Sequence, residues 1–137
     1  MQDRPTYDEL LAAVERFLRD EVVPNIGGAR SFHARVAANA LGIVRRELAN
    51  EDEQLEREWA GLDALLGRTE RPTGRTALRE AIARRTEELC ARIRAGEADA
   101  GPFRDAVLSH VRQTVRDKLL VTNPGWLGRA ALGDEAR

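Results

Sequence analysis

The sequence is short of several residue types that mark well-known classes of protein. Cys90 is its only cysteine, so the chain holds no disulfide framework and no thiol pair for zinc, which weakly favours a reducing compartment. Aromatic residues make up only 4% of the 137 residues, and Lys118 is the only lysine. We therefore expect Leu, Val, Ile and Ala to form the core.

A long hydrophobic run and an excess of one charge are also missing. The net charge of -1, with 33% charged residues, gives no electrostatic basis for binding nucleic acid or an anionic membrane surface. No stretch approaches the ~18 consecutive apolar residues of a membrane span. The opening residues MQDRPTYDE lack the apolar segment of a secretory signal. We expect a cytoplasmic protein with no nucleic-acid or membrane partner.

Helical periodicity is present along most of the chain, and no segment alternates like a strand. The sequence predicts an all-α fold, a single compact bundle of about five helices over residues 1–127, followed by a flexible tail over residues 128–137. Capping residues, glycines and prolines set the expected helix ends. The expected helices span about 6–23, 29–49, 50–66, 76–95 and 102–120.

The first expected helix is bounded by Thr6 and Pro24. Thr6, with Glu9 three residues later, is typical of a capping box. Pro24 disfavours helical geometry at the residue before it, so the helix should end at Val23. Its buried stripe is expected to contain Leu10, Leu11, Val14, Phe17 and Leu18.

A helix boundary is also predicted at Asn50. Asn50, the acids that follow it and Glu53 are typical of an N-cap and an acidic first turn. The segments 29–49 and 50–66 should then be separate helices, and one helix running uninterrupted through Asn50 is the alternative. The later segment is expected to bury Leu55, Trp59, Leu62 and Leu66.

The segment 32–48 is the central helix of the predicted bundle. Its buried face is expected to contain Phe32, Val36, Ala40, Ile43, Val44 and Leu48. His33 projects into the same arc, where a lone histidine is most simply a packed residue with one hydrogen bond. Patterns of metal-binding histidines such as HxxxH and HExxH are absent. We predict no metal site and no catalytic residue.

Glu47 and Lys118 each lie within the apolar arc of their own helix. A buried charge is tolerated only when it is paired or neutralised. We predict that the two side chains, or one of them with an arginine such as Arg46, form a partly buried ion pair. The alternative is that each methylene stem packs while its charged end reaches water.

Arg35, Asn39 and Arg46 form a polar stripe on one flank of the central helix. Their donors could bind a phosphate or a carboxylate, and a solvated flank is the simpler alternative. Further along, a turn signal over residues 123–125 should end the last helix. It precedes Trp126, a residue type that often anchors interfaces.

Two segments, PNIGGARSFHARVAANALGIVRREL and VRDKLLVTNPGWL, resemble a bacterial family of uncharacterised small domains. Members of that family are encoded beside, or fused to, kinases of the aminoglycoside-phosphotransferase type. The resemblance extends from Pro5 to about Leu127. Its motif positions fall on Phe32, His33, Arg35, Val36, Asn39, Glu47, Lys118, Asn123 and Pro124.

The resemblance implies an accessory role beside a kinase that phosphorylates hydroxyacyl-CoA or hydroxy-acid substrates, with acyl-CoA dehydrogenases as further pathway partners. The chain lacks a P-loop, the HxDxxxxN signature and an Asp-Phe-Gly element, so we expect no enzyme activity and no cofactor in it. The alternative is a stand-alone helical module that binds an acyl-CoA or another anionic small ligand. The candidate partner- or ligand-binding residues are Phe32, His33, Arg35, Asn39, Arg46, Glu47, Lys118, Asn123 and Trp126.

Overall fold

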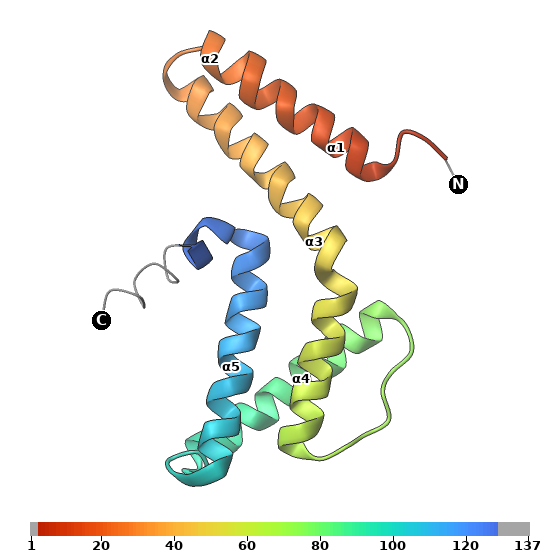
Figure 1. Cartoon of the computed structure of the whole chain (residues 1–137), viewed down its shortest axis with the longest axis vertical. Coiled ribbons are helices and arrows are strands. Elements are labelled where there is room, and N and C mark those ends of the chain that lie inside the picture. The colour runs from red at the N-terminus through yellow and green to blue at the C-terminus, as the bar shows by residue number, and fades with distance from the viewer. Residues whose placement is uncertain (1–2, 129–137) are drawn as a thin grey trace. The chain divides into compact units, whose positions relative to one another are not determined.

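The computed structural model describes residues 3–128, and within this range all regular structure is helical (Figure 1). The all-α prediction is therefore confirmed. The elements are α1 (Tyr7–Arg16), the π-helix η1 (Phe17–Val22), α2 (Val23–Asn25), α3 (Gly28–Leu66), α4 (Arg75–Arg94) and α5 (Gly101–Thr122). The chain forms two compact units, one ending at Ala49 and the other beginning at Asn50. We call them the first unit and the second unit.

The first helical segment begins as the sequence predicts but ends later. The hydroxyl of Thr6 accepts a hydrogen bond from the Glu9 backbone N–H, and the Glu9 carboxylate accepts one from the Thr6 backbone N–H. The predicted end at Val23 is wrong, because the chain stays helical through Asn25. The wide turn of η1, which closes with a bond from the Val23 N–H to the Leu18 carbonyl, precedes Pro24. It lets the helix accept a residue with no N–H to donate.

The predicted helix boundary at Asn50 is also wrong, and the alternative of one uninterrupted helix is confirmed, since α3 runs from Gly28 to Leu66. Glu51 and Asp52 resemble the acids of a first helical turn, but they pair with arginines of α4 instead. Glu51 is buried and lies 3.2 Å from Arg75 Nη1, and it also forms an ion pair with Arg79. A carboxylate that is paired in this way needs no helix N-terminus.

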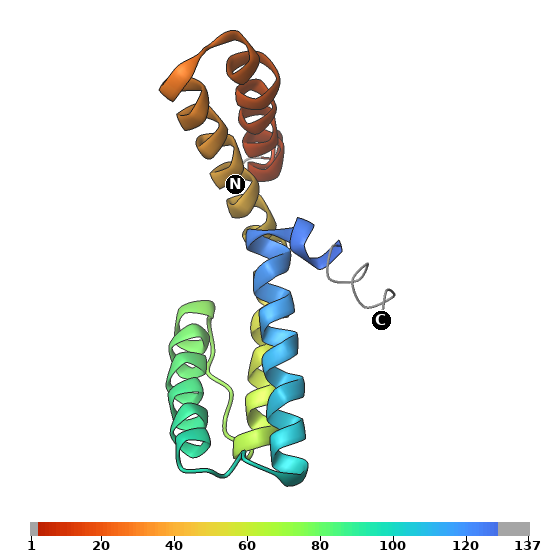
Figure 2. The same ribbon diagram turned by 90° about the vertical axis from the view of Figure 1, so that its left-hand side faces the viewer.

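The second unit is a three-helix assembly of the later part of α3 with α4 and α5 (Figure 2). Leu62 is fully buried at its centre. The other buried core residues are Trp59, Leu78, Ala81, Ile82, Leu89 and Val107. The buried Arg85 of α4 donates to the carbonyls of Leu62 (3.1 Å) and Gly67 (2.7 Å) near the C-terminal end of α3. Gly67 follows the last residue of α3, so its carbonyl has no partner within the helix, and Arg85 supplies one.

The first unit is a hairpin in which α1, η1 and α2 pack against the earlier part of α3 (Figure 1). The face of α3 that is covered carries small residues, with Ala38 1% exposed and Gly42 buried one turn later. An added Cβ at Gly42 would lie 3.2 Å from Glu15 Oε1, which shows how closely the two helices approach.

The apolar faces that the sequence predicts to be buried in the first unit are instead largely exposed. On α3, the predicted stripe includes Phe32 (59% exposed), Val36 (51%), Val44 and Leu48. We call these four residues the outer stripe of α3. The exposed large apolar residues of α1 and η1, here the outer stripe of α1, are Tyr7, Leu10, Val14 and Phe17. A hairpin of two helices covers only one face of each, and here close approach selects the face with small residues.

Candidate functional site

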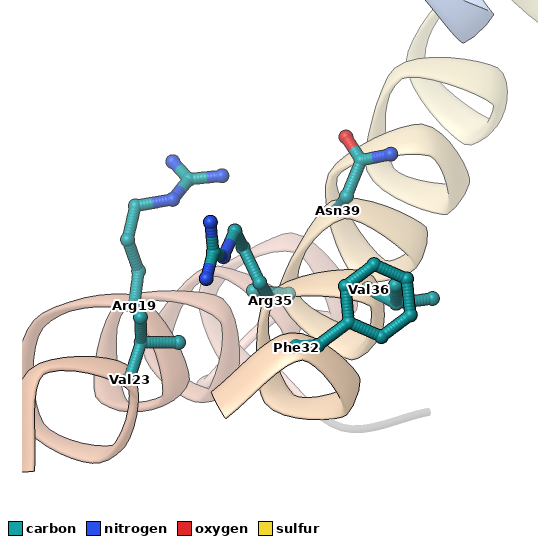
Figure 3. Close-up of a pocket in the computed structure, with 7 residues that line it drawn as sticks. Arg19, Val23, Phe32, Arg35, Val36 and Asn39 are labelled. Atoms are coloured by element: carbon teal, nitrogen blue, oxygen red, sulfur yellow. The ribbon is translucent and has the colours of Figure 1, made fainter. Parts of the chain in front are cut away.

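A pocket of about 700 Å³ opens on the first unit, between η1 and α3 (Figure 3). The residues Phe32, Arg35 and Asn39, all predicted binding candidates, line it together. Its remaining lining residues are Arg19, Val23, Val36 and Ala38. The volume lies within the ~300–1,000 Å³ range that is typical of small-molecule sites. Helical spacing along α3 therefore brings three of the predicted candidates to one place.

The pocket has a polar wall and an apolar wall. Figure 3 shows the guanidinium groups of Arg19 and Arg35 extending on the same side, with the Asn39 amide further along α3. The ring of Phe32 and the side chain of Val36 form the apolar part. Within residues 3–128, the side chain of Arg35 forms no hydrogen bond or ion pair, so its five donors are available to a ligand.

Beside the pocket, a carboxylate buried between the helices holds two arginines. The Glu15 side chain is 10% exposed, and its oxygens lie 2.9 Å from Arg19 Nη2 and 3.0 Å from Arg45 Nη1. Arg45 also binds Asp8 through its Nε, at 2.8 Å. Hydrogen bonding from Arg45 lowers the pKa of Asp8 and, together with the bond to Glu15, raises the pKa of Arg45. These bonds fix α1 against α3 and position Arg19.

Sequence reasoning missed Arg19, Glu15 and Arg45 as parts of this site. The two partners of Arg45 lie 30 and 37 residues away along the chain, so no local pattern indicates their pairing. No sequence signal marked Arg19 either, because it lies in η1 and a π-helical turn has no distinctive residue pattern.

Arg46 and His33 do not line the pocket, although both lie on α3 beside residues that do. Arg46 Nη1 would lie 3.2 Å from an added Cβ at Gly42, which places it near the helix contact. His33 is exposed, and its ring meets the Phe32 ring edge-on, with the centroids 5.6 Å apart. The prediction that His33 is a packed residue with one hydrogen bond is therefore wrong, because its side chain lies at the surface beside Phe32.

Glu47 and Lys118 belong to different units, and both are exposed. Their predicted ion pair stays a prediction. Lys118 lines a second pocket, of about 400 Å³, in the second unit. The buried carboxylate of α5 is its neighbour Asp117, which pairs with Arg57 at 3.2 Å and accepts a hydrogen bond from Gln113 at 3.1 Å. This network joins α5 to α3.

The turn signal over residues 123–125 ends α5 as predicted, because Asn123 is the C-cap and its N–H bonds to the Leu119 carbonyl at 2.8 Å. Helical structure resumes at residues 124–128. Trp126 is 57% exposed, and its backbone N–H bonds to the Asn123 carbonyl at 3.0 Å. The tail predicted over residues 128–137 lies, beyond residue 128, outside the described residues.

The second histidine, His110, is half-buried on α5 and lies against Gly61 of α3. Burial lowers its pKa, Glu58 opposes this shift, and Lys118 adds to it. The part of the chain that the structure describes contains no group of three or more His, Cys, Asp or Glu side chains that could hold a metal ion. Among residues 3–128, no helix combines the length and apolarity needed to cross a membrane.

Comparison with known proteins gives one finding. The model of a family described as a domain of unknown function, DUF6285, matches residues 24–126. The match covers all of α3, α4 and α5, and therefore the side of the pocket formed by Phe32, Arg35 and Asn39. Neither the comparison with curated proteins nor the comparison with solved structures gives a match.

Proposed function

The chain belongs to the DUF6285 family, and we propose that it is a non-catalytic subunit that binds a partner protein through the outer stripes of α1 and α3. One observation carries the proposal: eight large apolar residues of the first unit are exposed. Single exposed apolar residues are ordinary on protein surfaces. Here they recur at helical spacing on both helices of the hairpin, which is the pattern of faces that pack against a neighbour.

The size of the two stripes suits a protein partner. The exposed fractions of these residues range from 40% for Leu48 to 59% for Phe32. Three of the eight are aromatic, and an aromatic side chain has an area of ~150–250 Å², so these three alone expose on the order of 350 Å². A stable interface buries about 800 Å² on each partner. The aromatic residues thus offer close to half of the surface that a specific interface needs, and the aliphatic residues of the stripes add to it.

The charge of the first unit indicates what the partner is like. Residues 1–49 contain as many acidic as basic side chains, and two of the acids, Asp8 and Glu15, are already paired with Arg45. A highly charged partner would gain little from this surface. The expected partner therefore presents an apolar groove or helix face of its own.

The resemblance noted from the sequence makes an aminoglycoside-phosphotransferase-like kinase the first partner to test. In that role the chain would complete or stabilise a kinase that acts on hydroxyacyl-CoA or hydroxy-acid substrates, and the kinase would supply the catalytic residues. Acyl-CoA dehydrogenase pathway enzymes are the next partners to test.

Co-expression with such a kinase from the same organism tests the proposal. Val14 and Val115 are a matched pair, because each is a valine inside a helix and each is 49% exposed. Val14 lies on the outer stripe of α1, whereas Val115 lies on α5 in the second unit. We expect a stoichiometric complex by light scattering, lost in Val14→Asp and retained in Val115→Asp. ATP consumption with a hydroxyacyl-CoA substrate should fall only with Val14→Asp.

Three results would reject the proposal. The first is a kinase that purifies alone and is fully active. The second is an equal effect of Val14→Asp and Val115→Asp. The third is that the isolated chain forms a homodimer that Val14→Asp dissociates, because a second copy would then cover the stripes.

A further inference from the structure

We propose that the pocket of the first unit binds an amphipathic carboxylate, with the carboxylate held by Arg35 and Arg19 and the hydrocarbon part against Phe32 and Val36. This inference concerns a small ligand, and because Phe32 and Val36 also belong to the outer stripe of α3, a ligand in the pocket and a partner on that stripe would share these two residues. It rests on three observations: the charge balance around the pocket, its apolar wall, and the way η1 presents Arg19.

The charge balance leaves positive charge at the polar wall. Glu15 is shared by Arg19 and Arg45, and Asp8 binds Arg45 as well. These two carboxylates thus serve two arginines, and Arg35 has no acidic partner within residues 3–128. A guanidinium binds a carboxylate through two parallel N–H donors, and charge-assisted bonds of this kind are about twice as strong as neutral ones. The Asn39 amide adds a donor from the next turn of α3.

The apolar wall excludes a simple inorganic anion as the best ligand. Phe32 and Val36 are each more than half exposed, and Val23 is half-buried. An inorganic phosphate bound to the arginines would leave these apolar surfaces in water, whereas a hydrocarbon chain would cover them. A neutral hydrocarbon would in turn leave Arg35 without a partner. Only a ligand with both parts uses both walls.

The backbone supports the same assignment. Arg19 lies in η1, and π-helical turns are rare and occur frequently at functional sites. The ion pair between Arg19 and the buried Glu15, at 2.9 Å, orients this guanidinium before any ligand arrives. A positioned donor loses less entropy on binding than a mobile one.

Isothermal titration calorimetry on the full chain tests the proposal with octanoate as the probe. Octanol and inorganic phosphate are the comparison ligands, since each carries one half of the proposed chemistry. We expect octanoate to bind and the other two ligands to bind at least about tenfold more weakly, because each uses only one wall. Arg35→Gln and Phe32→Ala should each weaken octanoate binding by about tenfold or more.

Arg30→Gln is the matched control, because Arg30 is an exposed arginine of the same helix that does not line the pocket. It should leave octanoate binding unchanged. The proposal is overturned if octanoate does not bind at millimolar concentration, or if Arg30→Gln weakens binding as much as Arg35→Gln. It is also overturned if octanol or phosphate binds as tightly as octanoate. Because no partner protein is present, these results are independent of the co-expression experiment.

Discussion

The two units of the chain differ in how they bury large apolar residues. Among residues 3–128, only the second unit has a core of them, although it also exposes residues such as Val115 and Trp126. In the second unit, three helices meet around Leu62 and Trp59, which are 0% and 6% exposed. In the first unit, two helices meet around Ala38 and a buried carboxylate, Glu15, and the large apolar residues lie outside. The second unit therefore holds its fold with a hydrophobic core. The first unit is held by the ion pairs of the buried Glu15 and by packing on small residues such as Ala38, and much of its large apolar surface stays exposed.

Two leucine substitutions, one in each unit, should give the largest difference in the free energy of unfolding. Leu62→Ala should lower the free energy of unfolding by about 3–5 kcal/mol, because it removes a fully buried side chain and leaves a cavity. Leu10→Ala should cost less than about 0.5 kcal/mol, because Leu10 is 49% exposed on the outer stripe of α1. Urea unfolding followed by circular dichroism measures both values. Equal losses would show that Leu10 is buried in solution and would remove the contrast between the units.

Two glycines of α3, one in each unit, give a smaller contrast. A Cβ at Gly61 would lie 2.3 Å from His110 Nδ1, so Gly61→Ala must displace a ring and should destabilise the protein by about 1 kcal/mol despite the better helix propensity of alanine. A Cβ at Gly42 would meet only the ends of the long side chains of Arg46 and Glu15, at 3.2 Å.

Gly42→Ala should therefore be neutral or stabilising by up to about 1 kcal/mol, since those side chains can move and alanine favours the helix. Thermal unfolding of both variants checks the difference. If Gly42→Ala lowers the stability more than Gly61→Ala does, the side chains of Arg46 and Glu15 are held rigidly between α1 and α3 and cannot move away from the added Cβ.

The sequence predicts the contribution of α3 to the core of the second unit well, because apolar periodicity and packing agree there. Leu55, Trp59, Leu62 and Leu66 share a helical face, and the structure places all four in or against the core. In the first unit, periodicity identifies which residues share a face, such as Phe32 and Val36, but not whether this chain covers that face. The covered face of α3 contains Ala38 and Gly42, and small residues contribute little to a hydrophobic pattern.

Only one side of the pocket could be predicted, because the sequence shows which residues share a helix face but not how the helices pack. Arg35 and Asn39 are four residues apart on one helix, so their shared position follows from the helix repeat. The opposite side of the pocket comes from Arg19 and Val23, and its place depends on how the hairpin closes. The same holds at Asn50, where the acids that resemble a helix start are satisfied by Arg75, an arginine distant in the sequence.

Acidification should destabilise the two units at different pH values, because His110 of the second unit titrates at a higher pH than Asp8 of the first. These effects are the smallest that we predict. Burial lowers the pKa of His110 below 6.5, so the unfolded chain binds the proton more readily and the second unit loses stability as the pH falls through 6.5 toward the lowered value. Arg45 lowers the pKa of Asp8 below 3.8, so the contribution of that pair to the first unit is present above pH 3.8 and is lost as the pH falls through the lowered value.

Between pH 7.5 and 5, therefore, only the second unit should weaken, and His110→Gln should remove that dependence while Asp8→Asn leaves it unchanged. Urea unfolding followed by the fluorescence of the tryptophans, Trp59 and Trp126, measures this because both residues lie in the second unit. A dependence that persists in His110→Gln would assign the titration to another group. A dependence that Asp8→Asn abolishes would mean that the two units do not unfold independently, and the contrast between them would then be one of packing rather than of stability.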